Sequence, residues 1–254
     1  GEWTLQNYLD IFVDASFYKA VGNTLVISLI KLALCFPFSI VIAIQLSELK
    51  NATLSKLILI IICLPNFLSW AVVIGLWKGL MDAQGGAVNH LLVTLGIIDD
   101  NYALMAQNSW FKAMVIFLSA WKGAGWGSIM FYAAIMSIDK TYYESATIEG
   151  ANKLQKIWYL TIPSILPTIA LMLVMNISGI MDAGFEQVYT MMRANAEFEE
   201  TQIILGTYLY NISVVNRTNI PFATALGVFN GLIALLLMLV GNLITTKTMK
   251  RSLW

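Results

Sequence analysis

The sequence predicts an all-α membrane protein, a polytopic helical bundle that crosses the bilayer five times. Of its 254 residues, 58% are hydrophobic and only 12% are charged, whereas soluble domains carry about 25% charged residues. The apolar residues are gathered in long runs, and a helix needs about 20 of them to cross the hydrocarbon core of a bilayer. Polar segments separate these runs. Composition and pattern therefore both indicate a membrane protein.

Five runs are long enough to span the membrane, and no connection between them is long enough to form a separate soluble domain. They cover residues 21–46, 57–80, 114–138, 165–189 and 222–244. Pro37 and Pro65 fall inside the first two runs, where we expect kinks. Residues 1–254 are thus predicted to form a single transmembrane domain.

Basic residues in the connections predict the orientation, because cytoplasmic loops are enriched in Lys and Arg. One side would carry Lys50, Lys56, Lys140, Lys153, Lys156, Lys247, Lys250 and Arg251, and the other Lys19, Lys78, Lys112, Arg193 and Arg217. The first side is richer and is predicted to be cytoplasmic, which places segment 139–163 in the cytoplasm. An odd number of spans then puts Gly1 outside.

Segment 139–163 is a polar, helix-forming island between two apolar runs. Thr141 and Glu144 have the spacing of a capping box, in which each side chain binds a free backbone N–H of the other residue. Gly150 suits the left-handed conformation that ends many helices. We therefore predict a helix of about two turns over residues 142–149.

A second helix is predicted from residue 153 onward, because Asn152 and Gln155 have the spacing of a helix start. Pro163 would stand in the first turn of the next span, where its missing N–H leaves no bond unmade. A short rigid helix that is held at both ends by membrane helices could transmit a movement between a soluble partner and the membrane-spanning helices. The alternative is an amphipathic helix on the lipid surface, which the apolar Ile148 and Trp158 permit.

The same segment resembles the signature loop of the permease subunits of bacterial binding-protein-dependent ABC importers. Glu144-Ser145-Ala146, three residues, Gly150, nine residues and Leu160-Thr161-Ile162-Pro163 keep the family spacing of Glu-Ala-Ala, Gly and Ile-x-Leu-Pro. The sequence departs from the family pattern at Ser145, Leu160 and Ile162. The resemblance implies the type I importer permease fold, in which this loop is the coupling helix and sits in a cleft of a separate ATPase. The implied coupling residues are Glu144, Ser145, Ala146, Gly150 and Pro163.

The resemblance also implies the partners and the number of spans. Permeases of this family are multi-pass proteins of the bacterial inner membrane. They pair with a second, related permease, two cytoplasmic ATPase subunits and an extracytoplasmic solute-binding protein. They usually have six core helices, which implies that one N-terminal helix is missing here. The sequence has no Gly-x-x-x-x-Gly-Lys-Ser/Thr loop to hold phosphates, so we expect this chain to be no enzyme and ATP and Mg²⁺ to bind the partner ATPase.

Weaker motifs, in the expected order, are similar to those of carbohydrate-uptake permeases. They are Asn23-Thr24, Leu64-Pro65, Gly85-Gly86 with Asn89 and Leu91-Leu92, Ala120-Trp121-Lys122, and Gly184-Phe185-Glu186-Gln187-Val188. The last motif looks like the oligosaccharide and polysaccharide branch. The resemblance thus implies that the chain forms half of a translocation path for an oligosaccharide.

Polar and aromatic residues inside the predicted spans are the candidates for the solute path, because charges at bilayer depth are costly and usually face water or a partner. The candidates are Trp121, Lys122, Asn176, Asp182, Glu186 and Gln187. Asn176, Asp182 and Glu186 would form a stripe along one face of the fourth span. Polar contacts between helices, or a place at the outer membrane interface, are the alternative.

Other function classes find less support in the sequence. A permease for a peptide, an amino acid or a polyamine would share the signature loop and remains an alternative. A membrane-embedded enzyme would need clustered carboxylates, histidines or a metal, but the acids of segment 197–200 suit a solvated loop. One histidine, His90, and two cysteines, Cys35 and Cys63, offer no metal site. The zero net charge gives no indication of a nucleic-acid partner.

Overall fold

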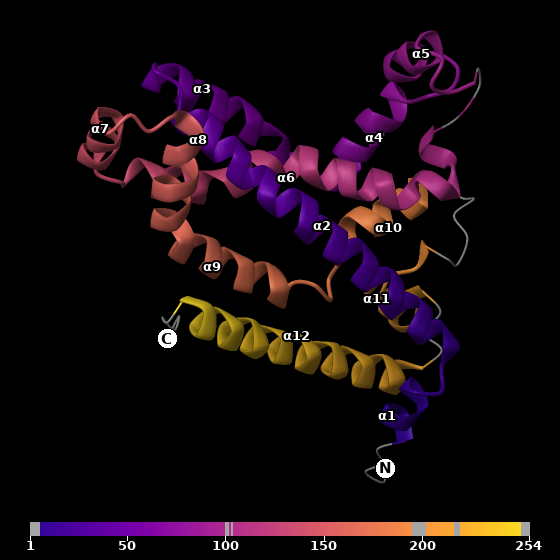
Figure 1. Cartoon of the computed structure of the whole chain (residues 1–254). Coiled ribbons are helices and arrows are strands. Elements are labelled where there is room, and N and C mark those ends of the chain that lie inside the picture. Colours follow the sequence, from indigo (N-terminus) through magenta and orange to yellow (C-terminus); the bar gives the residue numbers. More distant parts are fainter. Residues whose placement is uncertain (1–5, 100–101, 103, 195–201, 216–218, 250–254) are drawn as a thin grey trace. The chain divides into compact units, whose positions relative to one another are not determined.

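The computed structural model describes residues 6–99, 102, 104–194, 202–215 and 219–249. Within these ranges the regular elements are helices, and no strand is formed (Figure 1). The α-helices are α1 (Gln6–Ile11), α2 (Ala15–Ser47), α3 (Ala52–Cys63), α4 (Trp70–Leu80), α5 (Ala87–Thr94), α6 (Phe111–Met136), α7 (Lys140–Ile148), α8 (Lys153–Lys156), α9 (Ile162–Ser178), α10 (Phe185–Ala194), α11 (Leu205–Tyr210) and α12 (Ile220–Met249). Short 3-10 turns cover Leu64–Phe67, Leu104–Ala106 and Asn108–Trp110, and π-turns cover Ile157–Thr161 and Asn211–Val215. The all-α prediction is confirmed.

Three helical segments of the described chain are long and apolar enough to cross a membrane. They are Ala15–Ser47, Lys153–Ser178 and Ile220–Leu243. A fourth is present if Ala52–Phe67 and Trp70–Leu80 count as one broken span. Helix α6 has 26 residues but is not among them, because Lys122 and several glycines lower its hydropathy. The predicted number of five spans is therefore not confirmed.

The second predicted span is broken rather than kinked. Helix α3 passes into the 3-10 turn Leu64–Phe67, and α4 starts again at Trp70. Pro65 lies in this turn and has no N–H to continue the helical bonding. The side chain of Ser69 then caps α4 by accepting the N–H of Val72. Pro37, by contrast, lies inside α2, which continues past it.

The fourth predicted span, residues 165–189, is wrong as a continuous helix. Helix α9 ends at Ser178, and α10 begins at Phe185. Between them the backbone is left-handed at Ala183 (φ 51°) and Gly184 (φ 82°), which cannot continue a right-handed helix. The apolar run concealed this break because hydropathy does not register backbone conformation.

The chain forms two compact units. Unit 1 contains Gly1–Ile30, Leu68–Leu118 and Gly179–Leu236, and unit 2 contains Lys31–Phe67, Ser119–Ser178 and Leu237–Trp254. Helices α2, α6 and α12 contribute residues to both units. A single domain over residues 1–254 stays a prediction.

Buried polar side chains connect distant segments inside unit 1. The Gln187 side chain is fully buried and donates a 2.7 Å hydrogen bond to the carbonyl of Val115. The buried Thr24 hydroxyl accepts the N–H of Leu205 at 2.8 Å. Because buried polar groups need partners, these bonds fix α10 on α6 and the start of α11 on α2.

Unit 2 has its own core and one very close helix crossing. The core consists of Ala43, Phe131, Ile135 and Ile165, from α2, α6 and α9. Helix α6 also crosses α3, and a side chain at Gly125 would overlap the backbone carbonyl of Ile62. Glycine is required at this position because the neighbouring group is backbone and cannot rotate away.

Candidate coupling loop and solute-path residues

Helix α7 starts from Asp139 and not from the predicted capping box of Thr141 and Glu144. Asp139 has an extended backbone, and its carboxylate accepts the N–H of Thr141 at 3.0 Å. This hydrogen bond favours the charged carboxylate and lowers the pKa of Asp139. The capping-box prediction is wrong because Thr141 lies inside the first turn, where its own N–H needs a partner.

The end of α7 follows the prediction at Gly150. The backbone of Gly150 is left-handed, with φ +82°. Its N–H binds the carbonyl of Thr147 at 3.1 Å, and the N–H of Ala151 binds the carbonyl of Ala146 at 2.9 Å. This pair of bonds is the Schellman motif, which satisfies the last carbonyls of a helix. Gly150 is therefore confirmed as the helix stop.

The second helix also starts as predicted. The Asn152 side chain accepts the N–H of Gln155 at 2.9 Å, and the Gln155 side chain accepts the N–H of Asn152 at 2.8 Å. These reciprocal bonds form a capping box. The end of α7 and the start of α8 are therefore each held by a pair of capping hydrogen bonds.

From this start the helix runs without interruption through α8, the π-turn Ile157–Thr161 and α9. In the π-turn the N–H of Ile162 binds the carbonyl of Ile157, five residues back. Pro163 therefore lies inside a continuous helix, and the prediction that it stands in the first turn of the next span is wrong. Pro163 has no N–H for the carbonyl of Tyr159, and the wider turn before it accommodates this missing bond.

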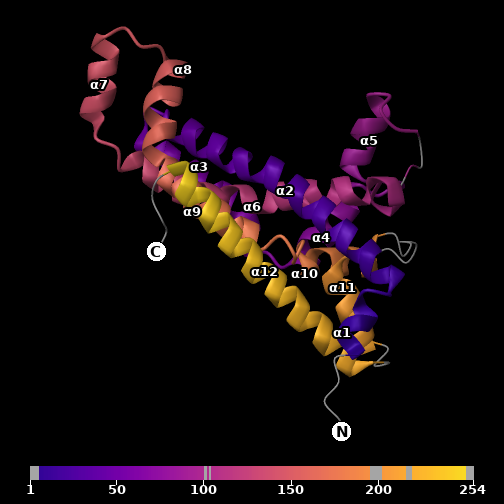
Figure 2. The same ribbon diagram turned by 60° about the horizontal axis from the view of Figure 1, so that its bottom comes forward.

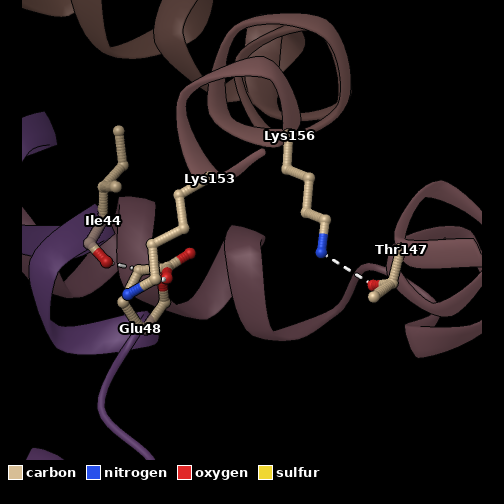
Figure 3. Close-up of polar contacts among 6 residues, drawn as sticks. Ile44, Glu48, Thr147, Lys153 and Lys156 are labelled. Atoms are coloured by element: carbon tan, nitrogen blue, oxygen red, sulfur yellow. Dashed lines mark hydrogen bonds and ion pairs between the residues drawn. The ribbon is translucent and has the colours of Figure 1, made fainter. Parts of the chain in front are cut away.

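Two hydrogen bonds fasten α7 to the helix that follows it, and both views show α7 beside α8 (Figures 1 and 2). The Tyr143 hydroxyl lies 2.9 Å from that of Thr161, which is buried and donates in turn to the carbonyl of Lys156. The Lys156 ammonium donates to the Thr147 hydroxyl at 2.7 Å (Figure 3). Because Tyr143 and Thr147 are four residues apart, α7 is held along one face.

A weaker contact joins the same helix to the end of α2. The Lys153 ammonium lies 3.6 Å from a carboxylate oxygen of Glu48 (Figure 3). The N–H of Glu48 binds the carbonyl of Ile44, so this acid directly continues the last turn of α2. Since 81% of the Lys153 side chain is exposed, the ion pair contributes only about 0.5 kcal/mol.

An open hollow of about 480 Å³ lies between α7 and the following helix. Its lining consists of Tyr142, Ser145, Ala146, Glu149, Gly150, Ala151, Gln155, Lys156, Tyr159 and Leu160. Ser145, Ala146 and Gly150 of the predicted coupling residues line this hollow, whereas Glu144 and Pro163 do not. The hollow combines small residues with rings and charges, so it could receive a side chain from a partner.

The outer face of α7, formed by Glu144 and Ile148, points away from this hollow. The two residues are four apart and share one face of the helix. Ile148 is 88% exposed. Leu154 and Tyr159 of the same segment are also exposed, and several exposed apolar side chains in one short segment suit contact with another surface.

The solute-path candidates of unit 2 lie in different settings. Lys122 is buried, and its ammonium donates to the carbonyl of Asn66 at 2.7 Å, at the 3-10 turn after α3. Trp121 is half-buried on the same helix. Asn176 is exposed on α9, and its amide donates to the carbonyl of Met172 at 2.8 Å.

The remaining candidates belong to unit 1. Asp182 is exposed in the turn between α9 and α10, Glu186 is exposed on α10, and Gln187 is buried against α6. The predicted stripe of Asn176, Asp182 and Glu186 is wrong, because the helix that would carry it is broken and Asn176 belongs to the other unit. Roles of the six candidates in solute passage stay predictions.

Comparison with known proteins assigns the chain. Residues 35–251 match the family described as binding-protein-dependent transport system inner membrane component. The chain belongs to this family. It is also similar to the polygalacturonan/rhamnogalacturonan transport system permease protein YteP of Bacillus subtilis (strain 168), with 33% identity over 97% of this chain and 76% of that protein.

The fold of this permease agrees with two solved structures of a bacterial alginate transporter. One is a transporter involved in the import of the acidic polysaccharide alginate, with a TM-score of 0.88 and 32% identity over 96% of this chain and 84% of that chain. The other holds an alginate pentasaccharide-bound periplasmic protein, with a TM-score of 0.89 and 32% identity over 99% of this chain and 85% of that chain. The resemblance and fold class are thus confirmed, and the permease is a multi-pass protein of the bacterial inner membrane.

Sequence reasoning missed the residues that attach α7 to the rest of this permease. Tyr143 and Thr161 are 18 residues apart, and Thr147 and Lys156 are nine apart across the Gly150 break. No local pattern predicts such pairs. The proline after a π-turn is the one signal that could have indicated the special geometry at Thr161.

Proposed function

We propose that this permease imports an oligosaccharide and forms half of its translocation path. The observation that carries the proposal is α7, a short helix capped at both ends and fastened to a membrane-spanning helix through Tyr143 and Thr147. A partner that moves α7 would therefore move the spanning helix. The carbohydrate class rests on the relatives, which carry polygalacturonan, rhamnogalacturonan and alginate.

The partners follow from the same assignment. A second, related permease would complete the path, and two cytoplasmic ATPase subunits would bind the two coupling helices. ATP and Mg²⁺ would bind those subunits, so this chain would act as a transport subunit and not as an enzyme. An extracytoplasmic binding protein would deliver the solute, as the periplasmic protein bound to the alginate transporter suggests.

The docking of α7 on the ATPase can be tested at Ile148. Ile148→Glu places a charge where an apolar side chain would be buried by the partner, and we expect the ATPase subunits to be lost when the complex is purified. Trp158→Glu is the matched control, because Trp158 is also exposed (66%) but lies in the π-turn. Its complex should keep the ATPase.

Two results would contradict this proposal. An unchanged amount of ATPase in the complex purified with Ile148→Glu would contradict docking through this face of α7 and would favour a helix that lies on the lipid surface. If the reconstituted complex takes up an amino acid or a peptide but no sugar, the chain would still be an importer subunit, but the proposal that its solute is a carbohydrate would be wrong.

A further inference from the structure

Helix α10 has two faces of opposite character. Gln187, Val188 and Met191 are fully buried, and the helix packs against α4 and α11. Glu186 and Arg193 lie on the other side and are exposed. Because they are seven residues apart, they share one face, about 10.5 Å from each other along the axis.

Aromatic rings hold the guanidinium group of Arg193. One of its N–H groups donates to the Tyr189 hydroxyl at 3.2 Å, and its central carbon lies 5.8 Å from the centroid of the Tyr189 ring. Tyr189 is itself stacked on Phe185, with 5.5 Å between ring centroids, and packs edge-on against Tyr210 at 4.8 Å. The Arg193 side chain is therefore oriented before any ligand arrives, which reduces the entropy lost on binding.

The charge of Arg193 is not neutralised within the described part of the chain, where no carboxylate lies within ion-pair distance of it. Guanidinium has five N–H donors in a planar fork, and the Tyr189 hydroxyl occupies one of them. The remaining donors match the two oxygens of a carboxylate. A sugar with hydroxyls alone would not satisfy the charge equally well.

We propose that Glu186, Tyr189 and Arg193 form a subsite for a uronate unit of an acidic oligosaccharide. Arg193 binds the sugar carboxylate, Tyr189 is a positioning residue that orients Arg193, and Glu186 accepts hydrogen bonds from hydroxyls of a neighbouring sugar unit. The subsite rests on the proposed import of an oligosaccharide and narrows its solute to an anionic one.

The place of the subsite along the chain suits solute entry. The segment Lys153–Ser178 is long and apolar enough to cross the membrane, and a helix that crosses it has its two ends on opposite faces of the bilayer. The coupling loop precedes this span and α10 follows it. With the coupling loop in the cytoplasm, the subsite is on the outer side, where the solute arrives.

The test uses the complete transporter with its binding protein in proteoliposomes. The probes are trigalacturonate, its fully methyl-esterified and therefore neutral form, and maltotriose. Arg193→Gln should lower uptake of trigalacturonate by about tenfold and leave uptake of the methyl ester unchanged. Arg193→Lys should retain part of the preference for trigalacturonate over its methyl ester, because the positive charge remains. Tyr189→Phe should reduce this preference less than Arg193→Gln does, because the ring remains. Lys19→Gln, which removes an exposed charge from α2, is the control and should change the uptake of neither trigalacturonate nor its methyl ester.

The outcomes separate the subsite from the proposed function. Equal losses for both galacturonate probes, or a lower amount of assembled complex, would show that Arg193 supports the structure and would overturn the subsite. Uptake of maltotriose by the unmodified transporter without uptake of either galacturonate probe would also overturn it, while carbohydrate import would stand. Uptake of no sugar would overturn both.

Discussion

Single residues decide how closely the helices of unit 2 approach one another. Gly125 of α6 faces the backbone of Ile62 and Cys63, whereas Gly123, two residues earlier, has no atom within 4 Å of the position a side chain would take. Nothing in the sequence distinguishes Gly123 from Gly125, because both are glycines in the same apolar run. Only the structure shows which one is required, because the α3 segment that Gly125 meets lies some 60 residues earlier in the chain.

This difference predicts opposite results for two alanine substitutions. Gly125→Ala would force the crossing helices apart and should destabilise the protein by about 1–3 kcal/mol. Gly123→Ala should be neutral or slightly stabilising, because alanine favours the helix more than glycine does. Thermal unfolding of the purified complex in detergent measures both. A lower midpoint for Gly123→Ala than for Gly125→Ala would contradict the crossing geometry.

Local sequence patterns misplaced the start of α7 at Thr141 instead of Asp139, but they predicted the end of α7 and the start of α8, where the bonded partners are close in sequence. Gly150 and the pair Asn152 and Gln155 fall in this class, because their bonds span five residues or fewer. Gln187 does not, since it binds Val115 72 residues away. A polar residue in an apolar run was therefore predicted as a path candidate, although the structure shows its side chain bonded to α6.

At the scale of elements, α7 and the spanning helix are connected through the Tyr143 hydroxyl. The Thr161 hydroxyl already donates to the carbonyl of Lys156, so it accepts from Tyr143. Because Thr161 is the last residue of the π-turn, a movement of α7 would be passed to the point where the helical bonding changes from π to α.

We predict that Tyr143→Phe weakens coupling without releasing the ATPase. The ring stays in place, but the lost hydrogen bond is worth about 1 kcal/mol, or roughly a fivefold change in an equilibrium. The ratio of solute imported to ATP hydrolysed should fall, as measured in proteoliposomes. Tyr18→Phe is the control, because it removes a similar tyrosine bond, to the carbonyl of Phe12, in unit 1. An unchanged ratio for Tyr143→Phe, or an equal fall for both variants, would show that this bond does not transmit the movement.

Over the whole molecule, the sequence predicted the class of fold better than the course of the chain. The apolar runs 57–80 and 165–189 have the composition of spanning helices, but each contains a break. Pro65 is a sequence signal for the first break, because proline has no N–H to continue the helix. The second depends on the left-handed backbone of Ala183 and Gly184, and Ala183 carries no sequence signal for that conformation.

The predicted orientation of the whole molecule can be tested with single cysteines in a background that lacks Cys35 and Cys63. In intact cells, a cysteine at Lys153 should resist a membrane-impermeant thiol reagent, because the coupling loop is predicted to be cytoplasmic. A cysteine at Gln84, exposed between α4 and α5, should react. Reversal of this pattern would place the richer basic side outside and remove the coupling loop from any cytoplasmic ATPase.

The hydrogen bonds around α7 have a consequence for the divergence of such transporters. The bonds of Asp139, Tyr143, Thr147 and Asn152 described above have both partners within residues 139–163. Among the side-chain hydrogen bonds and ion pairs of the described residues, the weak pair of Lys153 with Glu48 joins this segment to the rest of the chain. The fold of the segment therefore depends mainly on hydrogen bonds within the segment itself. Exchanging the segment between two permeases should transfer the choice of ATPase, while each recipient keeps its own solute. The ATPase partner and the solute could therefore change independently of each other as such transporters diverge.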